Sequence, residues 1–263
     1  MKVNLSGKTA IVTGGATGIG KATAIKLATA GASVVVSDIN HKGAEKVVQE
    51  IIGLGGRATA VATDVSKEDD VINMVNQTLA TYQRIDILVN NAGISRAVRF
   101  MDTDTEQFDR FFNINVKGVY LCCQKALPHM IKQKYGKIVN ISSVAGREAD
   151  EFFVVYSATK FAVMGFTQGL AKEMAEHNIN VNAVCPGVVR TELWDNLLKQ
   201  LKIIPKNSEF GEEQIWEKEM EMIPMRRPQT PEDIANAVVF LSSDLAANIT
   251  GQGLNVCGGM RPR

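Results

Sequence analysis

Tyr156 and Lys160 lie four residues apart in this 263-residue chain, and together their side chains could move a proton. On a helix, residues four apart lie one above the other on the same face. An ammonium group beside a phenol stabilises the phenolate, so we expect Lys160 to lower the pKa of Tyr156 from its ordinary value of about 10. A tyrosine tuned in this way can act as a general acid or base. The spacing alone is also common on protein surfaces, so the pair needs support from other residues.

A glycine-rich turn, TGGATGIG at residues 13–20, supplies part of that support. Glycines let the backbone turn tightly and approach a pyrophosphate, and the free N–H groups of the following helix attract its charge. Asp38 ends the next predicted strand about 20 residues further on, where a carboxylate accepts hydrogen bonds from ribose hydroxyls and repels a 2′-phosphate. The pattern predicts NAD rather than NADP. A plain turn at the glycines and a strand-ending turn at Asp38 are the alternatives.

Short β-rich runs alternate with helical ones along the chain. The predicted strands are residues 8–13, 33–38, 58–63, 85–90, 137–142, 180–184 and 253–256, and the predicted helices are 18–30, 43–54, 67–82, 105–112, 114–134, 155–177 and 231–242. Near-continuously apolar strands separated by helices predict an α/β fold, a doubly wound parallel sheet covered on both faces. We expect one domain over residues 1–263. Residues 188–227 interrupt the alternation after a strand, and we expect them to form a substrate lid, packed onto the body by two apolar stripes.

Composition excludes several classes of protein. Hydrophobic residues make up 45% and charged residues 22% of the chain, which is ordinary for a folded globular protein. The net charge of +1 and the lack of a basic run give no footprint for nucleic acid. No apolar stretch is long enough to span a membrane, and the first residues lack an apolar signal core, so we expect a cytoplasmic protein. The four cysteines and three histidines have no metal-ligand spacing, so we expect no metal site.

Over nearly all its length the chain resembles the short-chain dehydrogenase/reductase family, whose fold is Rossmann-like. The matching motifs occur in the family's order: residues 13–20, Asp64-Val65, Asn90-Asn91-Ala92-Gly93, Asn115, Ser142-Ser143, Tyr156 to Lys160, and Pro186 to Thr191. The resemblance implies hydride transfer between a secondary alcohol and NAD, with Asn115, Ser143, Tyr156 and Lys160 as catalytic residues. Ser143 would bind the substrate oxygen, while Ser142, the adjacent alternative, should point elsewhere because side chains alternate along a strand. Asn115 would hold a water that links Lys160 to solvent, unless it only bends a helix.

The same resemblance assigns the cofactor contacts and the assembly. The cofactor-binding residues are then Gly14, Thr17, Gly18, Ile19, Gly20, Asp38, Asp64, Val65, Asn91, Ala92, Gly93, Tyr156, Lys160, Pro186, Gly187, Val189 and Thr191. Asn90 is expected to join neighbouring strands. A homotetramer is implied, with the two long helices 114–134 and 155–177 pairing with symmetry mates. The chain departs from the family at Arg226, where many relatives carry glycine, and at Cys257, where aspartate is usual.

The substrate is less sharply defined. The chain looks most like dehydrogenases of acetoin, butanediol or sugar alcohols, so a small polyol, diol or hydroxyketone is the leading substrate class. Ser143, Asp150, Glu151 and Trp194 are the candidate substrate contacts, although a solvated acidic turn is the favoured interpretation for Asp150 or Glu151 taken alone. The alternatives are a hydroxysteroid-type dehydrogenase, a 3-oxoacyl-carrier-protein reductase, which Asp38 disfavours, and a non-catalytic NAD-binding regulator.

Overall fold

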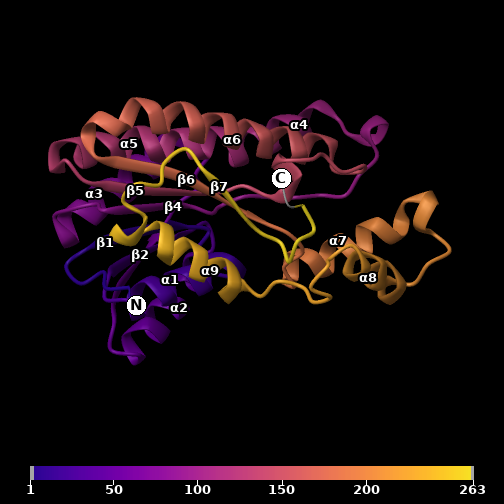
Figure 1. The fold of residues 1–263 in the computed structure, drawn as a ribbon, viewed down its shortest axis with the longest axis horizontal. Helices are drawn as coiled ribbons and strands as arrows, with labels where there is room; N and C mark the ends of the chain where they lie inside the picture. Colours follow the sequence, from indigo (N-terminus) through magenta and orange to yellow (C-terminus); the bar gives the residue numbers. More distant parts are fainter. Residues whose placement is uncertain (1–2, 262–263) are drawn as a thin grey trace.

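Seven parallel strands form one sheet in the computed structural model, which describes residues 3–261 (Figure 1). The strand order is β3-β2-β1-β4-β5-β6-β7, so the chain winds outward in both directions from β1. The strands are β1 (Thr9–Thr13), β2 (Ser33–Asp38), β3 (Arg57–Ala62), β4 (Ile87–Asn90), β5 (Gly136–Ile141), β6 (Ile179–Pro186) and β7 (Gly253–Val256). The predicted doubly wound parallel sheet is confirmed.

Helices cover both faces of this sheet (Figure 1). One layer holds α1 (Gly18–Thr29), α2 (His41–Gly53) and α9 (Pro231–Leu241), and the other holds α3 (Glu68–Tyr82), α5 (Gly118–Gln133) and α6 (Val154–Met174). Successive side chains of a strand point to opposite faces. Val34 and Val36 therefore pack in the core beneath α1 and α2, whereas Val35 between them packs in the core beneath α3, α5 and α6.

The predicted break in the helical pattern near Asn115 is a π-helical stretch, Asn113–Lys117, between α4 (Thr105–Phe112) and α5. Such stretches are rare and occur often at functional sites. This one buries the Asn115 side chain against the start of α6, where its amide donates to Thr159.

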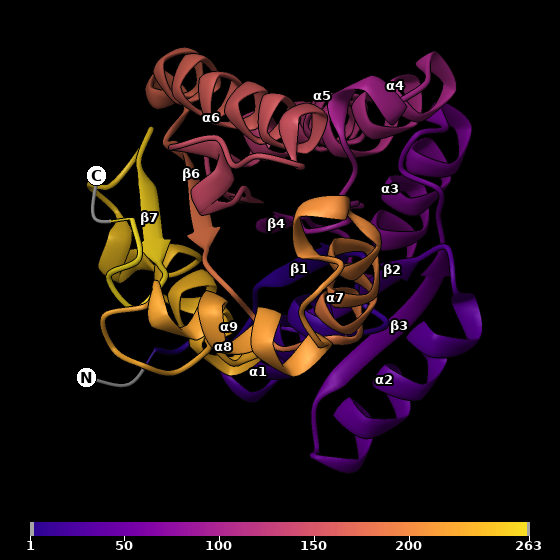
Figure 2. The same cartoon turned by 90° about the vertical axis from the view of Figure 1, so that its right-hand side faces the viewer.

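Residues 188–227 extend beyond the sheet at the carboxyl ends of its strands (Figures 1 and 2). They contain α7 (Glu192–Ile203) and α8 (Glu212–Glu221). The two apolar stripes were expected to pack onto the body, but they pack mainly against each other in a small core of their own. Its buried residues are Val188, Leu197, Leu198, Leu201, Ile204, Ile215, Trp216 and Ile223, with Ala97 the one from the body.

Most predicted boundaries lie within a few residues of the observed ones. The strand predicted over 85–90 begins at Ile87, although the Asp86 backbone just before it still bonds to Thr9 (2.9 Å) and Lys137 (2.8 Å) of the neighbouring chain segments. The strand predicted over 180–184 continues to Pro186, which pairs with Val256 of β7. Short 3₁₀ turns complete the elements: Phe100–Asp102, Val144–Gly146, Ala175–His177, Pro205–Asn207 and Asp244–Ala246. No helix within residues 3–261 is both long and apolar enough to cross a membrane.

Candidate active site

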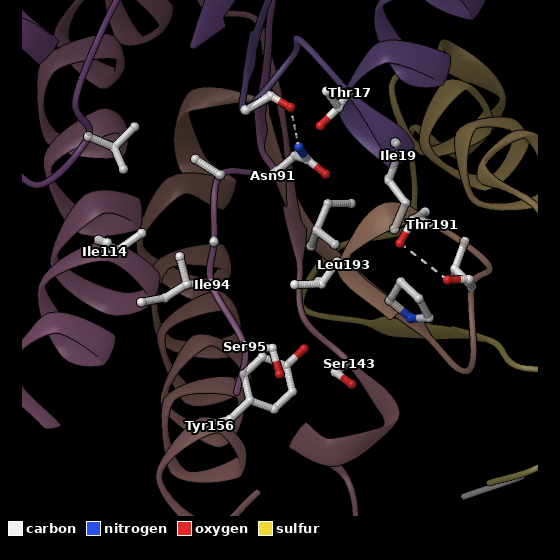
Figure 3. A pocket seen from close by; sticks show the side chains of 18 of the residues that line it. Thr17, Ile19, Asn91, Ile94, Ser95, Ile114, Ser143, Tyr156, Thr191 and Leu193 are labelled. Carbon is white, nitrogen blue, oxygen red and sulfur yellow. Dashed lines mark hydrogen bonds between the residues drawn. The ribbon is translucent and has the colours of Figure 1, made fainter. Parts of the chain in front are cut away.

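A cavity of about 490 Å³ lies at the carboxyl ends of the strands, where a parallel sheet of this kind binds ligands (Figure 3). Its lining includes most of the predicted site residues: Gly14, Thr17, Gly18, Ile19, Asp38, Asp64, Val65, Asn91, Ala92, Gly93, Ser143, Tyr156, Lys160, Pro186, Gly187, Val189, Thr191 and Trp194. Residues far apart in the sequence, from Gly14 to Trp194, therefore meet in one site. Gly20, Asn115, Asp150 and Glu151 lie outside this lining.

The glycine turn at one end of the cavity is held by Asn91. The Asn91 amide donates to the carbonyl oxygens of Thr13 and Gly14, both at 2.9 Å. Gly14 has a φ of +63°, and a Cβ on Gly20 would lie 2.0 Å from the Gly14 oxygen, so only glycine fits either place. Gly20 therefore lets α1 pack closely against the backbone of the turn, although Gly20 itself does not line the cavity. Thr17 precedes α1 without a side-chain cap, which leaves the first N–H groups of that helix without a helical partner.

Asp38 ends β2 at the edge of the same cavity. One carboxylate oxygen accepts from Ala16 N–H (2.9 Å) and the other from Asn40 N–H (2.8 Å), which fixes the orientation of the group. The cavity lining contains only two cationic side chains among the described residues, Arg110 and Lys160. Lys42, near Asp38 in the sequence, is exposed and lies outside the lining.

Tyr156 and Lys160 lie on the same face of α6, with the Lys160 ammonium 5.6 Å from the centre of the Tyr156 ring. Burial raises the pKa of Tyr156 to about 12, although a hydrogen bond with Ser143 acts to lower it. Burial also lowers the pKa of Lys160 to about 8. The expected lowering of the tyrosine pKa is thus not found in the protein alone. The physical reason is that burial of the phenol itself outweighs the hydrogen bond with Ser143, while the Lys160 ammonium donates to the Ile141 carbonyl (2.9 Å).

The two neighbouring serines point in different directions. Ser142 donates to the Lys160 carbonyl oxygen (3.0 Å), which anchors the end of β5 to α6. Ser143 accepts from Ala145 N–H (3.1 Å), and its hydroxyl reaches Tyr156. The alternation expected at the strand end is therefore present, and Ser143 is the serine beside the phenol (Figure 3).

Asn115 lies behind the cavity rather than on its wall. Its side chain accepts from Ile94 N–H (2.8 Å) and donates to the Ile94 carbonyl (2.9 Å) and the Thr159 hydroxyl (3.1 Å). A Cβ on Gly93 would lie 3.2 Å from the Asn115 amide oxygen and 3.7 Å from Lys160 Nζ, so a glycine keeps the space beside both groups open. Asn90 joins β4 to β5 through the Asn140 side chain (2.8 Å), as expected.

The structure does not bring the two predicted substrate carboxylates to the cavity. Asp150 pairs with Arg261 at 2.6 Å, and Glu151 pairs with Lys206 between the lid helices. Each carboxylate forms an ion pair with a cation far away in the sequence. The local sequence of the acidic turn could not predict these pairs. Trp194, by contrast, lines the cavity, and its ring packs edge-on to Trp216.

Several lining residues were missed from the sequence. Ile94, Ser95 and Leu193 line the cavity near Tyr156 and Ser143, and Arg110 and Glu192 are exposed residues that also border it (Figure 3). Ser95 could have been suspected, because it follows directly on the Asn90-Asn91-Ala92-Gly93 motif at the end of β4. The others carried no sequence signal.

These residues fit a nicotinamide dinucleotide. The tight glycine turn with free N–H groups suits a pyrophosphate, and the oriented Asp38 carboxylate suits a pair of ribose hydroxyls. The open face of Gly18, where an added Cβ would meet only Thr191 at 3.5 Å, leaves room for a close approach to the backbone.

Comparisons with known proteins point the same way. The model of the short chain dehydrogenase family matches residues 8–202. A 3-oxoacyl-[acyl-carrier-protein] reductase of Thermotoga maritima is 37% identical, over 98% of this chain and 99% of its own. A diacetyl reductase [(S)-acetoin forming] of Staphylococcus epidermidis is 39% identical, over 96% of this chain and 98% of its own.

Solved structures agree in fold. The crystal structure of 3-ketoacyl-(acyl-carrier-protein) reductase from Brucella melitensis complexed with NADH superposes with a TM-score of 0.88 at 36% identity, covering 98% of this chain and 100% of that one. Levodione reductase superposes with a TM-score of 0.92 at 31% identity, covering 98% and 99%. The likeness therefore extends along the full length of each chain.

Proposed function

The chain belongs to the short-chain dehydrogenase family, and on that premise we propose that it interconverts a secondary alcohol and a ketone with NAD(H) as the hydride carrier. The proposed substrate class is a polyol, a diol or a hydroxyketone. That the protein is an NAD(P)-dependent oxidoreductase follows from the family, and the choice of cofactor and substrate is the proposal.

One observation carries it. A single cavity is lined by Asp38 and the glycine turn as well as by Ser143, Tyr156 and Lys160. Figure 3 shows Thr17 and Asn91, which belong to the glycine-turn end, opposite Ser143 and Tyr156. A dinucleotide held by the first end extends toward the second, where a hydroxyl or carbonyl oxygen can lie between Ser143 and Tyr156. The cofactor, when bound, supplies or accepts the hydride.

The protein's own residues handle the proton. In reduction the Tyr156 phenol gives its proton to the carbonyl oxygen, and in oxidation its phenolate takes the proton of the alcohol. The Ser143 hydroxyl donates to the same oxygen and stabilises its developing charge. Burial lowers the pKa of Lys160 to about 8, and its ammonium lies beside the phenol, so we propose that it exchanges a proton with Tyr156 during the reaction. Asn115 fixes the Ile94 backbone and the start of α6 around this pair.

The choice of NAD rests on Asp38. Its carboxylate would lie against the adenosine ribose, and a 2′-phosphate there would meet a negative charge instead of an arginine or lysine. The relative from Brucella melitensis was crystallised with NADH, which supports the same cofactor in a protein of this kind.

A 3-oxoacyl-carrier-protein reductase is the second candidate function. Relatives of that name match this chain about as well as the diacetyl reductase does, at 37–41% and 39% identity. Asp38 does not separate the two, because the NADH-bound relative is itself named a 3-ketoacyl-carrier-protein reductase.

We also propose that the chain forms a homotetramer. Large apolar side chains on α4, α5 and α6 stay exposed in the single chain: Phe108, Tyr120, Val154 and Phe161. An apolar face of this kind on two long helices is typical of a subunit interface.

The test of the proposed function is a matrix of initial rates followed at the absorbance band of the reduced nicotinamide. NAD(H) and NADP(H) are each paired with diacetyl, acetoin, butanediols, hexitols, ketohexoses, an acetoacetyl thioester and a hydroxysteroid, with Tyr156→Phe as the blank. We expect NAD-linked turnover of a small diol or hydroxyketone that falls about 100-fold or more in the variant. Turnover of the thioester alone would establish the second candidate. NAD binding with no turnover on any compound would favour a non-catalytic NAD-binding protein.

A further inference from the structure

Residues 94–98, in the loop after β4, belong to no helix or strand, and Ile94 and Ser95 at the start of this segment line the cavity. Three other elements hold this segment. Asn115 bonds both the N–H and the carbonyl of Ile94, and Gln200 of α7 accepts from Ala97 N–H (2.9 Å). Val98 N–H donates to the Phe152 carbonyl (2.8 Å) in the loop before α6. The segment is therefore held by Asn115, by Gln200 of the lid and by Phe152 of the loop before α6.

Ser95 lies within this clamped segment, and its side chain lines the cavity. It occupies the same end of the cavity as Tyr156 and Ser143 (Figure 3). The two neighbouring serine hydroxyls have partners, since Ser142 donates to Lys160 and Ser143 accepts from Ala145. The structure gives the Ser95 hydroxyl no hydrogen-bond partner among the described residues. A positioned hydroxyl thus faces the substrate space with its donor and acceptor both unused.

Apart from the exposed Arg110 and Glu192 at the border of the cavity, the other side chains at this end are apolar or already engaged. Ile94, Leu193 and Trp194 supply apolar surface, and the carboxylates of Asp150 and Glu151 pair with cations elsewhere. The reacting oxygen of the substrate uses Tyr156 and Ser143. A second oxygen on the adjacent carbon would then meet Ser95, the remaining free polar group of this wall.

We infer that Ser95 is the specificity-determining residue that makes this enzyme prefer substrates with oxygens on two adjacent carbons; the inference rests on the proposed function. A serine hydroxyl can donate to a carbonyl oxygen and accept from a hydroxyl. Ser95 therefore serves a 1,2-diketone or 2-hydroxyketone in reduction and a vicinal diol in oxidation. A carboxylate in its place would only accept, and would suit the diol alone.

The experiment compares two ketones that differ by one oxygen, 2,3-butanedione and 2-butanone, with NADH. For each protein we measure kcat/KM on both ketones and take their ratio. Ser95→Ala is expected to lower the ratio of dione to monoketone about tenfold, the effect of one lost hydrogen bond. Ser95→Thr, which keeps a hydroxyl, is expected to retain most of the ratio. Ser143→Ala is the matched control, because it should lower both rates and leave the ratio within about twofold.

Two failures can be told apart. If the wild type reduces the dione but Ser95→Ala leaves the ratio unchanged, the inference is overturned and the proposed function stands. If the wild type binds NADH, followed by its fluorescence, yet turns over neither ketone, the inference is overturned, and the proposed function fails with it only if no polyol, diol or hydroxyketone of the matrix is turned over either. Thermal melts and NADH affinities of all the variants should match the wild type. A Ser95→Ala protein that loses NADH affinity would assign Ser95 to the cofactor site and overturn the inference.

Discussion

Asp38 has a structural role in the protein, and we propose that it also selects the cofactor. Its two oxygens hold the backbone N–H groups of Ala16 and Asn40, and this fixes the carboxylate at the edge of the cavity. A fixed negative charge discriminates between cofactors better than a mobile one, because it cannot turn away from a 2′-phosphate.

The corresponding prediction concerns cofactor preference. Asp38→Ser should raise the ratio of kcat/KM for NADP to that for NAD at least about tenfold, because it removes the repulsion and the ribose hydrogen bonds together. Lys42→Ala is the matched control, since Lys42 is exposed and lies outside the cavity lining. Steady-state rates with both cofactors measure the effect. An unchanged ratio in Asp38→Ser would place the adenosine ribose elsewhere.

Tyr156 and Lys160 illustrate the limit of reasoning from spacing. Four residues on a helix do bring the two side chains together, but burial acts on both in opposite senses, raising the tyrosine pKa to about 12 and lowering the lysine pKa to about 8. The sequence cannot show that the Lys160 ammonium is committed to the Ile141 carbonyl.

At the scale of elements, the end of the lid contains a strained residue. Arg226 has a φ of +54°, a left-handed conformation that favours glycine, and its guanidinium makes only an exposed contact with the Glu221 carbonyl (3.2 Å). A glycine would adopt this conformation without the steric penalty that a Cβ brings.

Arg226→Gly is therefore expected to raise the free energy of unfolding by about 0.5–1 kcal/mol. In a chain of this length that corresponds to a rise in Tm of about 1–3 °C. Arg227→Gly is the control, because Arg227 pairs with Asp233 at 2.6 Å and its loss should lower Tm. Scanning calorimetry of both variants tests this, and a lower Tm in Arg226→Gly would refute the strain.

Four charged side chains lie where α8 of the lid meets the loop before α6 and the last described residue: Glu148, Asp150, Glu219 and Arg261. Arg261 lies 2.6 Å from Asp150 and 3.4 Å from Glu148, and Glu219 of α8 lies close enough to interact with both Asp150 and Arg261. Burial and the charge of Asp150 raise the pKa of Glu219 to about 7, against an opposing effect of Arg261. Protonation of this one carboxyl group is thus coupled to the docking of α8.

The sign of the pH effect follows from the raised pKa. Between pH 4.5, the ordinary pKa of the side chain, and about pH 7, the folded protein keeps a proton that the unfolded chain has released, so stability from this group falls as the pH rises. The shift corresponds to about 3 kcal/mol at most, and contact of the side chain with solvent reduces it.

Glu219→Gln removes this titration. Its Tm should exceed that of the wild type by more at pH 8 than at pH 5, because only the wild type must then bury a charge. Glu217→Gln, on the exposed side of the same helix, should show no such difference between the two pH values. A difference for Glu219→Gln that stays constant with pH would show that the carboxyl group titrates normally.

At the scale of the whole molecule, the outer face of α6 is shaped for close contact. Phe161 is exposed, and Gly165 and Gly169 follow at intervals of four residues on the same face. A Cβ added to either glycine would meet nothing within 4 Å in this chain. Glycine on an exposed helix costs stability, so the absence of a side chain favours the approach of another subunit.

This face gives the prediction about assembly. The wild type should show a mass of four times 28.6 kDa by light scattering, and Gly165→Arg should dissociate it because the single chain has room for the side chain and an interface does not. Gly53→Arg is the control, since Gly53 in α2 has equally open surroundings away from this face. A Gly165→Arg protein that remains tetrameric would place the interface elsewhere.

The sequence by itself determined the alternation of strands and helices, the turn from Thr13 to Gly20, and the shared face of Tyr156 and Lys160. These features depend on the backbone period and on neighbours a few residues away, which a linear pattern records. Only the tertiary structure decided that Asp150 pairs with Arg261 and that Ser95 is clamped at the wall of the cavity. It also decided that the stripes of α7 and α8 pack on each other and that burial raises the pKa of Tyr156. Ion pairing, burial and desolvation arise between residues far apart along the chain, so no local pattern contains them.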